Sequence, residues 1–510
     1  MRVFFIYPNL EGQLGFNYGV AYLSSALKKE GHSTAMLNLN ENYENPSDEE
    51  IVERVRRFGA DVVGFSIVTT QLVVAERLAK LLKERLNVVT VAGGVHVTMA
   101  TEEVLRSGAF DYACVGEAEY SFSELIRRLS ENRPTDDIPG VWVYNGGQIV
   151  NNGAAPLPDI RTLPMKDYSI LDFQKLTDLR NGWVGLLAGR GCPFRCSYCF
   201  NHKFVDIYRH NLGVTAAELG YLRTHTPKQV LDEIRFLLEN YKRIKMFIFD
   251  DDIFTLDKRF LLRFLDGYRQ MGARVPFAAN AHIRFFSSEV AAALSSANCR
   301  IVKFGLESGS ERVRREVLHR YMSNGSIKRA FRNAALHHLH TSAFVMLGLP
   351  YETENDLFAT VKLLAEIKPG RFRWSVFYPF VGTEAYRMAL EGGFINREKL
   401  SNLRNFFTES PLEFGREQDL LIDKLNAAYP WFVNAHSDLE CAPHYRRLVH
   451  GILALPQEQW LKRKSNIADE DAEISKAMLK SGMRHYAIKF NRFMGVDSDY
   501  FVKEEADVAQ

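Results

Sequence analysis

The chain has 510 residues, which is too long for one ordinary hydrophobic core, so we expect two or three domains. An apolar content of 46% and a charged content of 25% are typical of a folded protein. A net charge of +2 gives no reason to expect nucleic acid or an anionic membrane as a partner, and no apolar run reaches the roughly 18 residues of a membrane span.

The first 130 residues alternate short apolar strands with amphipathic helices. This pattern predicts a doubly wound parallel sheet of the Rossmann-like or flavodoxin-like kind, whose ligands bind beyond the carboxyl ends of the strands. We expect the N-terminus to form the first strand, because its apolar stretch is too short for the hydrophobic region of a signal peptide. The predicted strands cover 3–7, 33–38, 61–66, 88–92 and 112–115, and the helices cover 18–30, 48–58, 71–86 and 120–129.

Small residues follow three of these strands at the same topological position. Ser66 and Thr69 follow the third strand, Gly93 and Gly94 the fourth, and Gly116 the fifth. Glycine at a strand end lets the backbone approach a ligand closely. Any one of these turns is equally well explained as a tight turn, but the three together predict a binding pocket.

A second alternating array follows a predicted hairpin at 141–150 and a proline-rich linker. Six βα units predict a partial, TIM-like (β/α)6 barrel, with its chemistry at the carboxyl ends of the strands. The predicted strands cover 183–188, 245–249, 275–280, 300–305, 342–347 and 373–377, and the helices cover 227–241, 257–271, 287–297, 326–338 and 354–367.

Beyond residue 395 the spacing is helical and irregular, and the polar tail 502–510 is expected to fray. The fold class is therefore α/β with a helical C-terminal module. The predicted domains are an N-terminal domain at 1–135, a hairpin and linker at 136–180, a barrel at 181–395 and the helical module at 396–510.

Three cysteines directly follow the first barrel strand, in the motif Cys-Pro-Phe-Arg-Cys-Ser-Tyr-Cys. They are Cys192, Cys196 and Cys199. A [4Fe–4S] cluster normally takes four cysteines, so three would leave one iron with an open coordination position. The alternatives are buried structural thiols or a zinc site completed by His202, although zinc sites usually show a second C-x₂-C pair.

The other three cysteines are scattered and odd in number, which argues against a disulfide framework. We therefore expect a reducing compartment, the cytoplasm.

The cysteine motif resembles the C-x₃-C-x-(aromatic)-C signature of the radical S-adenosylmethionine superfamily. The first 130 residues resemble the cobalamin-binding domain that precedes the barrel in one branch of that superfamily, the class B methyltransferase-like enzymes. The resemblance covers residues 1–395. It implies that the three cysteines hold the cluster, that the open iron chelates S-adenosylmethionine, and that cobalamin is a further cofactor.

The resemblance also implies a set of contacts to S-adenosylmethionine at the barrel strand ends. Simple loop packing, a helix cap or an exposed arginine remain alternatives for single members of the set. The implied residues are Tyr198 against adenine, Asp250 and Asp251 near the amino group, Glu307 and Ser308 in the G-x-E-S-G turn, Arg320 facing the carboxylate, and Gly348 in the G-L-P turn.

A corresponding set of cobalamin contacts is implied for the N-terminal domain. The motif D-x-H-x-x-G is absent from the sequence, which implies a cobalt without a histidine ligand from that motif. His96 alone would more often be an ordinary turn histidine. The implied residues are Ser66, Thr69, Gly93, Gly94, His96, Gly116 and Glu117.

The pairing of the two modules predicts methylation of an unactivated carbon, in which a 5′-deoxyadenosyl radical abstracts hydrogen and cobalt carries the methyl group. The alternatives are oxidative cyclisation or ring rearrangement without net methylation, and a non-catalytic cobalamin sensor. No catalytic side chain is assigned. The expected partners are a small-molecule substrate and an electron donor such as flavodoxin or ferredoxin.

Aromatic residues suggest an apolar substrate pocket for a lipid, isoprenoid, tetrapyrrole or natural-product intermediate. Ordinary core packing explains most of them equally well. The candidates are Phe204, Tyr208, His210, Tyr221, Trp374, Tyr378 and Trp431.

Overall fold

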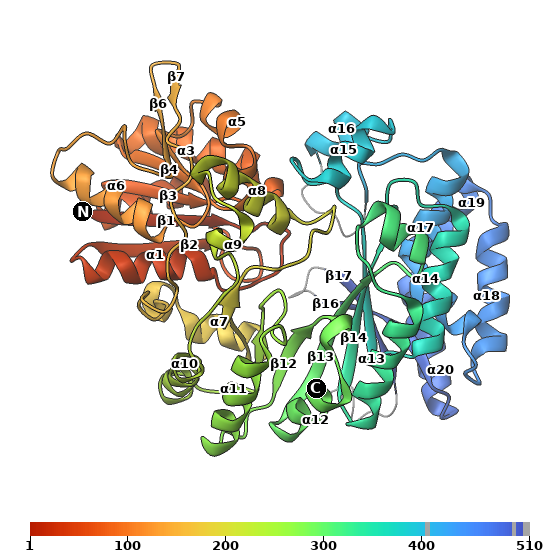
Figure 1. Ribbon diagram of the computed structural model, residues 1–510. Helices are drawn as coiled ribbons and strands as arrows, with labels where there is room; N and C mark the ends of the chain where they lie inside the picture. Colours follow the sequence, from red (N-terminus) through yellow and green to blue (C-terminus); the bar gives the residue numbers. More distant parts are fainter. Residues whose placement is uncertain (403–408, 492–495, 503–510) are drawn as a thin grey trace. The chain divides into compact units, whose positions relative to one another are not determined.

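The computed structural model describes residues 1–402, 409–491 and 496–502 (Figure 1). The chain divides into two compact units. The first contains Met1–Arg195, Cys199–Asp252 and Phe380–Thr383, and the second contains Cys196–Tyr198, Ile253–Pro379 and Glu384–Gln510. The tail that is expected to fray lies outside the described residues, apart from Val502.

The first unit contains a seven-stranded sheet in the order β2-β1-β3-β4-β5-β6-β7. Strands β1 to β5 pair in parallel, and the β6–β7 hairpin adds antiparallel to β5. This arrangement confirms the predicted doubly wound sheet. The strands are β1 (Arg2–Pro8), β2 (Ser33–Leu39), β3 (Val62–Ser66), β4 (Val89–Gly93), β5 (Tyr112–Cys114), β6 (Val141–Asn145) and β7 (Gln148–Val150).

The helices of this sheet begin and end where local residues cap them. Asn17 accepts a hydrogen bond from the backbone of Val20 at the start of α1, and Ser47 with Glu50 forms a capping box at the start of α2. The short helices α4 and α5 are not predicted from the sequence. The helices are α1 (Tyr18–Lys29), α2 (Asp48–Phe58), α3 (Leu72–Leu86), α4 (Val95–Met99), α5 (Thr101–Arg106) and α6 (Glu119–Ser130).

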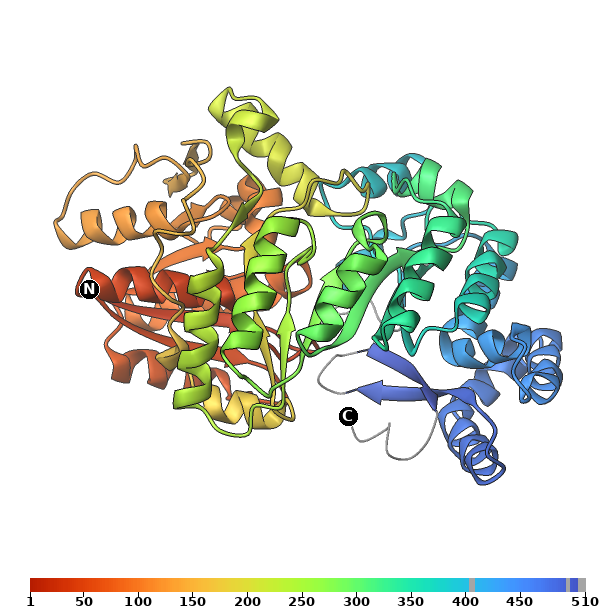
Figure 2. The ribbon, with the colours of Figure 1, turned by 60° about the horizontal axis from the view of Figure 1, so that its bottom comes forward.

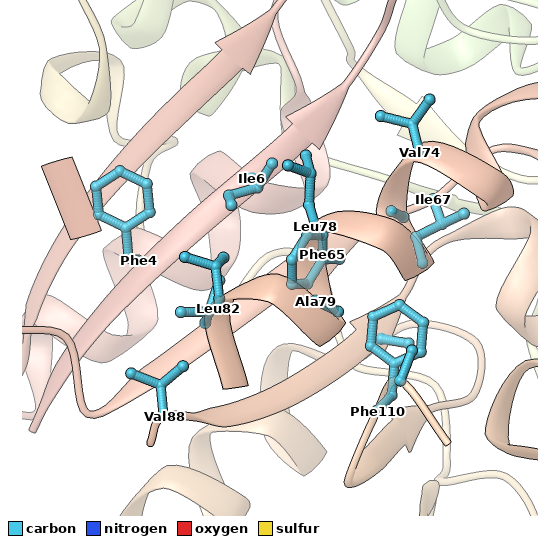
Figure 3. Close-up of a cluster of buried hydrophobic side chains, with 14 of the residues drawn as sticks. Phe4, Ile6, Phe65, Ile67, Val74, Leu78, Ala79, Leu82, Val88 and Phe110 are labelled. Atoms are coloured by element: carbon cyan, nitrogen blue, oxygen red, sulfur yellow. The ribbon is translucent and has the colours of Figure 1, made fainter. Parts of the chain in front are cut away.

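The two faces of this sheet are used differently. Phe4 and Ile6 of β1 pack against α3 residues such as Leu78 and Leu82, in the buried core shown in Figure 3. Successive side chains of a strand point to opposite faces, so Phe5 points to the other face. That face carries α1 and α6, and it also lines the cavity described below.

The first unit also contains the start of the second parallel array. Strand β8 pairs in parallel with β11, and the short strands β9 and β10 pair antiparallel. The segment after the cysteine motif, for which the sequence analysis predicts no element, is helical. These elements are α7 (Phe173–Leu179), β8 (Trp183–Leu186), β9 (Gly189–Arg190), α8 (Phe200–Leu212), α9 (Ala216–Leu219), β10 (Arg223–Thr224), α10 (Pro227–Asn240) and β11 (Met246–Phe249).

In the second unit, four strands pair in parallel in the order β12-β13-β14-β15, each followed by a helix. With β8 and β11 they supply the six βα units that the sequence predicts. The elements are β12 (Phe277–Ala281), β13 (Cys299–Glu307), β14 (His340–Leu347), β15 (Arg371–Val376), α11 (Lys258–Gln270), α12 (Ser288–Ser296), α13 (Asn324–Leu336) and α14 (Glu354–Ile367).

The C-terminal module is helical, as predicted, but it ends in a hairpin that the sequence analysis does not predict. Strand β17 pairs antiparallel with β16 and with β15, and the hairpin is drawn as blue arrows in Figure 2. The elements are α15 (Glu384–Glu391), α16 (Arg397–Asn402), α17 (Arg416–His436), α18 (Ala442–Ala454), α19 (Gln457–Lys464), α20 (Ile467–Lys480), β16 (His485–Asn491) and β17 (Val496–Val502). None of the helices in the described part of the chain has both the length and the apolar character needed to cross a bilayer.

A buried ion pair joins the linker to α10 in the first unit. The Lys166 ammonium lies 2.8 Å from the Glu233 carboxylate, and the Lys166 side chain is 1% exposed. Tyr168 donates a hydrogen bond to the same carboxylate. Two charges withdrawn from water in this way are each stabilised by the other.

Lys166→Met should therefore lower the free energy of unfolding by about 3–5 kcal/mol, because it leaves the Glu233 carboxylate buried without its cation. Urea denaturation of the purified protein measures the change. The matched control is Lys228→Met, which removes an ion pair whose lysine side chain is 83% exposed, and which should cost less than about 1 kcal/mol. Equal losses in the two variants would contradict the role given to the buried pair.

Candidate active site

The cysteine loop begins at β9 and ends at the first residue of α8. Gly191 has φ +94°, and a Cβ atom there would lie 2.4 Å from the Tyr221 carbonyl oxygen, so this turn requires glycine. The Cys199 side chain accepts a hydrogen bond from the Asn201 backbone and caps α8. Cys192 and Cys199 lie in the first unit and Cys196 in the second, and none of the three forms a disulfide.

The described residues contain no group of three or more His, Cys, Asp or Glu side chains arranged around a single metal ion. That the three cysteines hold an iron–sulfur cluster stays a prediction.

Arg320 lies at the carboxyl end of β13, beside the buried cysteine. One guanidinium nitrogen is 3.6 Å from the Cys196 sulfur and 3.4 Å from the Tyr198 hydroxyl, and another donates to the Gly305 carbonyl at 2.7 Å. Burial alone would lower the pKa of Arg320. Electrostatic attraction to Tyr198, Glu307 and Cys196 is stronger than this effect and raises the Arg320 pKa above its ordinary value. The alternative of an exposed helix arginine is therefore wrong, and a permanent cation stands beside the cysteine loop.

Glu307 occupies the G-x-E-S-G turn in a conformation that is rare outside glycine, with φ +64°. Burial raises the pKa of its carboxyl, and Arg320 counters part of that rise. Ser308 is fully buried, and the hydroxyl of Thr360 accepts a hydrogen bond at 2.8 Å from the backbone of Gly309. The turn thus brings Glu307 and Arg320 together at the end of one strand.

The G-L-P turn after β14 is held by a residue that the sequence analysis misses. The Glu352 carboxylate accepts hydrogen bonds from the backbone N–H groups of Gly348 at 2.9 Å and Leu349 at 3.1 Å. Burial raises the pKa of Glu352 to about 8. In the sequence, Glu352 follows the turn residue Pro350 by two positions. That spacing alone does not indicate whether the glutamate is buried or exposed, so the sequence does not identify its role.

Three adjacent carboxylates follow β11, and each has a different partner within the first unit. Asp250 accepts a hydrogen bond from the Tyr18 hydroxyl at 2.7 Å, and the Asp251 carboxylate accepts one from the Ala188 backbone at 3.0 Å. Asp252 accepts one from Asn201 at 3.0 Å. The helix cap is a different residue, Asp257, which accepts hydrogen bonds from the first turn of α11.

A cavity of about 580 Å³ opens at the carboxyl ends of β1, β3, β4 and β5 in the first unit. Its floor is apolar, and five residues of the predicted cobalamin set line it. It is lined also by Asn17 and Tyr18, which the sequence analysis misses because they precede a helix rather than follow a strand. The five predicted residues are Ser66, Gly93, Gly94, Gly116 and Glu117.

Thr69 and His96 lie beside each other, 3.1 Å apart between hydroxyl and Nδ1, but they are not among the lining residues. The His96 side chain is buried, and its Nε2 has no hydrogen-bond partner among the described residues. Burial lowers the pKa of His96, which keeps the imidazole neutral.

The cavity suits the nucleotide tail of a corrinoid. Its lining is mostly apolar and includes Gly93, Gly94 and Gly116, and its volume lies in the range of ordinary cofactor pockets. A Cβ atom at Gly94 would lie 2.7 Å from the backbone of Ile67, so close packing of the turn depends on glycine. The residues present therefore fit the group that the sequence predicts.

The predicted aromatic pocket is only partly formed. Phe204 lines the cavity together with Phe200, whereas His210 is exposed. In the second unit, the Trp374 indole donates to Asn426 and the Trp431 indole donates to Asp471, so both residues pack in the core of that unit. Tyr208 and Tyr221 belong to a small buried cluster, and Tyr378 is buried.

A cofactor-sized cavity in a doubly wound domain, followed by a three-cysteine loop at the first strand of a βα array, is typical of an enzyme that uses two cofactors. Residues 12–126 match the B12 binding domain family, and residues 186–364 match the Radical SAM superfamily. The chain belongs to the cobalamin-dependent radical S-adenosylmethionine enzymes, which use cobalamin, a [4Fe–4S] cluster and S-adenosylmethionine.

Known proteins support this assignment. The chain is 26% identical over 423 residues to an uncharacterized methyltransferase, PH0819, of Pyrococcus horikoshii, covering 81% of this chain and 87% of the relative. It is 25% identical over 403 residues to the anaerobic magnesium-protoporphyrin IX monomethyl ester cyclase of Rubrivivax gelatinosus, covering 76% and 70%.

The structure of the cobalamin-dependent S-adenosylmethionine radical enzyme OxsB is similar in fold. It superposes with a TM-score of 0.68 at 14% identity, covering 94% of this chain and 81% of OxsB. The sequence relatives thus include both a methyltransferase and a cyclase.

Asp251→Asn should change how stability depends on pH. Burial raises the pKa of Asp251 from 3.8 to about 7, so the folded chain holds this proton more tightly than the unfolded chain. Its stabilising contribution is present below pH 4 and is lost as the pH rises through 7. Between pH 5 and pH 8 the wild-type free energy of unfolding should fall by about 2–3 kcal/mol more than that of the variant.

Urea denaturation of the apoprotein across this pH range measures the difference. The asparagine carbonyl still accepts the Ala188 hydrogen bond, so the comparison isolates the proton. Parallel pH profiles for the two proteins would contradict the raised pKa.

Arg320→Met should weaken binding of S-adenosylmethionine by about tenfold to hundredfold, the value of a hydrogen bond to a charged group. Equilibrium dialysis with the cluster-loaded enzyme measures the affinity. Arg300→Met is the control, because Arg300 lies on β13 but is exposed. Wild-type affinity in the Arg320 variant would exclude a carboxylate contact.

Proposed function

We propose that the chain transfers a methyl group from cobalamin to an unactivated carbon of a small-molecule substrate. The observation that carries this proposal is the position of the last motif cysteine, Cys199, next to the helix that lines the cavity of the first unit. Phe200 and Phe204 of α8 line the cavity of the B12 domain, and α8 begins directly after the cysteine Cys199. One short helix therefore connects Cys199 with the cavity inside the first unit.

Each cofactor has a proposed set of protein ligands. Cobalamin would occupy the glycine-lined cavity, with no histidine from D-x-H-x-x-G below the cobalt. The cluster would be held by Cys192, Cys196 and Cys199. S-adenosylmethionine would meet Tyr198, Asp250, Asp251, Glu307, Ser308, Arg320 and Gly348.

The cofactors supply the reactive chemistry, namely a radical from S-adenosylmethionine at the cluster and a methyl group from cobalamin. The protein supplies orientation and charge. Arg320 offers a fixed cation for a carboxylate, and Glu307 beside it offers an acceptor for an ammonium group. A radical mechanism requires no general base.

The leading alternative within the same family is cyclisation without net methylation. The similarity to the cyclase of Rubrivivax gelatinosus supports it, at nearly the same identity as the similarity to the methyltransferase. We place the substrate among apolar small molecules that bear a ring or long chain, in a reducing compartment with flavodoxin or ferredoxin as electron donor. The six cysteines, none of which forms a disulfide, support the reducing compartment.

Anaerobic incubation of the reconstituted enzyme with cobalamin, reductant and candidate substrates should give 5′-deoxyadenosine and a product heavier by one CH₂ unit. Mass spectrometry identifies both. Cys199→Ala should abolish both products, whereas Cys441→Ala, which removes a buried cysteine outside the motif, should retain them. If deoxyadenosine forms together with a dehydrogenated product that carries no added methyl group, methyl transfer is wrong and cyclisation is the reaction.

A further inference from the structure

The turn after β5 is bound to the strands that flank the cysteine loop. The Arg190 guanidinium contacts the Glu117 carboxylate at 2.5 Å and the Glu119 carboxylate at 2.6 Å. The Arg223 guanidinium contacts both oxygens of Glu117, at 2.5 Å and 3.0 Å. The side chains of Arg190, Glu117 and Arg223 are 14%, 20% and 13% exposed, so these contacts are largely removed from water.

These contacts leave Glu117 little capacity for a ligand. Both of its carboxylate oxygens accept from arginine, although its residue lines the cavity. Burial alone would raise the pKa of Glu117, but Arg190 and Arg223 hold it below its ordinary value. The carboxylate is therefore charged and committed to the two arginines.

The position of the two arginines shows what the contacts hold in place. Arg190 ends β9, two residues before Cys192, and Arg223 lies on β10, which pairs with β9. Arg190 also packs over the Tyr22 ring of α1, at 4.8 Å. The start of the cysteine loop is thus bound to the B12 domain from two sides.

The end of the cysteine loop is bound to the same turn. The Glu117 backbone N–H donates a hydrogen bond at 2.7 Å to the hydroxyl of Tyr208, which lies on α8, the helix that Cys199 caps. A Cβ atom at Gly116 would lie 1.9 Å from that hydroxyl, so glycine is needed for this contact. Gly116 and Glu117 therefore meet both flanks of the cysteine motif.

We propose that Glu117 is a positioning residue: with Arg190, Arg223 and Tyr208 it clamps both ends of the cysteine loop to the B12 domain and so sets the separation between cluster and cobalt. This inference rests on the proposed function for its two cofactors. It revises the implied role of Glu117 as a cobalamin contact. Because misplacement of reacting groups by about 1 Å can cost a hundredfold in rate, such a clamp bears directly on methyl transfer.

The test compares Glu117→Gln with Arg223→Gln in enzyme loaded with cobalamin and cluster. Arg223 does not line the cavity, so its loss removes no direct contact with a ligand there, although it also removes a hydrogen bond to the Pro158 carbonyl at 2.9 Å. Both variants should bind cobalamin at the wild-type level. Both should shift or broaden the distance distribution between cob(II)alamin and the reduced cluster, measured by pulsed electron paramagnetic resonance, and should raise deoxyadenosine release relative to methylated product by about tenfold.

Asp232→Asn is the matched control, since it removes one carboxylate from an exposed ion pair on α10 and should leave the distance distribution unchanged. Tyr208→Phe supplies a milder variant, which removes one hydrogen bond without removing a charge, and should shift the distribution less in the same direction.

Loss of cobalamin from Glu117→Gln alone would show that Glu117 binds the cofactor and would overturn the proposal. An unchanged distance distribution in Glu117→Gln, Arg223→Gln and Tyr208→Phe would overturn it as well. The distance distribution and the cobalamin content are both measured without substrate. They therefore test the positioning role of Glu117 even if the proposed methyl transfer is wrong.

Discussion

A buried carboxylate between two arginines organises the first unit. Glu117 is largely withdrawn from water and is stabilised there by Arg190 and Arg223. Removing one partner of such a pair costs more free energy than the intact pair contributes. Ionic contacts of this kind add little to the net free energy of folding. Because charged hydrogen bonds require specific distances and angles, they can fix the relative position of two segments more precisely than hydrophobic contacts do.

Helix α8 extends the same arrangement into the cofactor site. Phe200, Phe204 and Tyr208 recur every four residues and so lie along one helical face. The first two line the cavity, and the third meets the turn after β5. Helix α8 begins directly after Cys199 and contacts the turn after β5 through Tyr208. Its role in this arrangement is to fix the position of the cysteine loop, not to take part in the reaction.

The sequence predicts those parts of the molecule whose cause is local. Strand and helix periods and the glycines at strand ends depend on near neighbours, and the structure confirms them. The partners of Glu117 lie 73 and 106 residues away, and no short pattern indicates them. The β16–β17 hairpin depends on the edge of β15, a contact that is equally distant in sequence.

The turn Gly116-Glu117-Ala118-Glu119 is open to two interpretations, direct binding of a cofactor or positioning of a neighbouring segment. Its glycine lies at the end of a strand, where close approach to a ligand is the usual interpretation, yet the atom it admits is the hydroxyl of Tyr208. Its first glutamate lines the cavity, yet its charge is directed to arginines. Its second glutamate meets Arg190 as well. A motif can therefore occur beside a cofactor site because it positions a neighbouring segment. The hydrogen-bond partners of its polar atoms distinguish this role from direct binding of the cofactor.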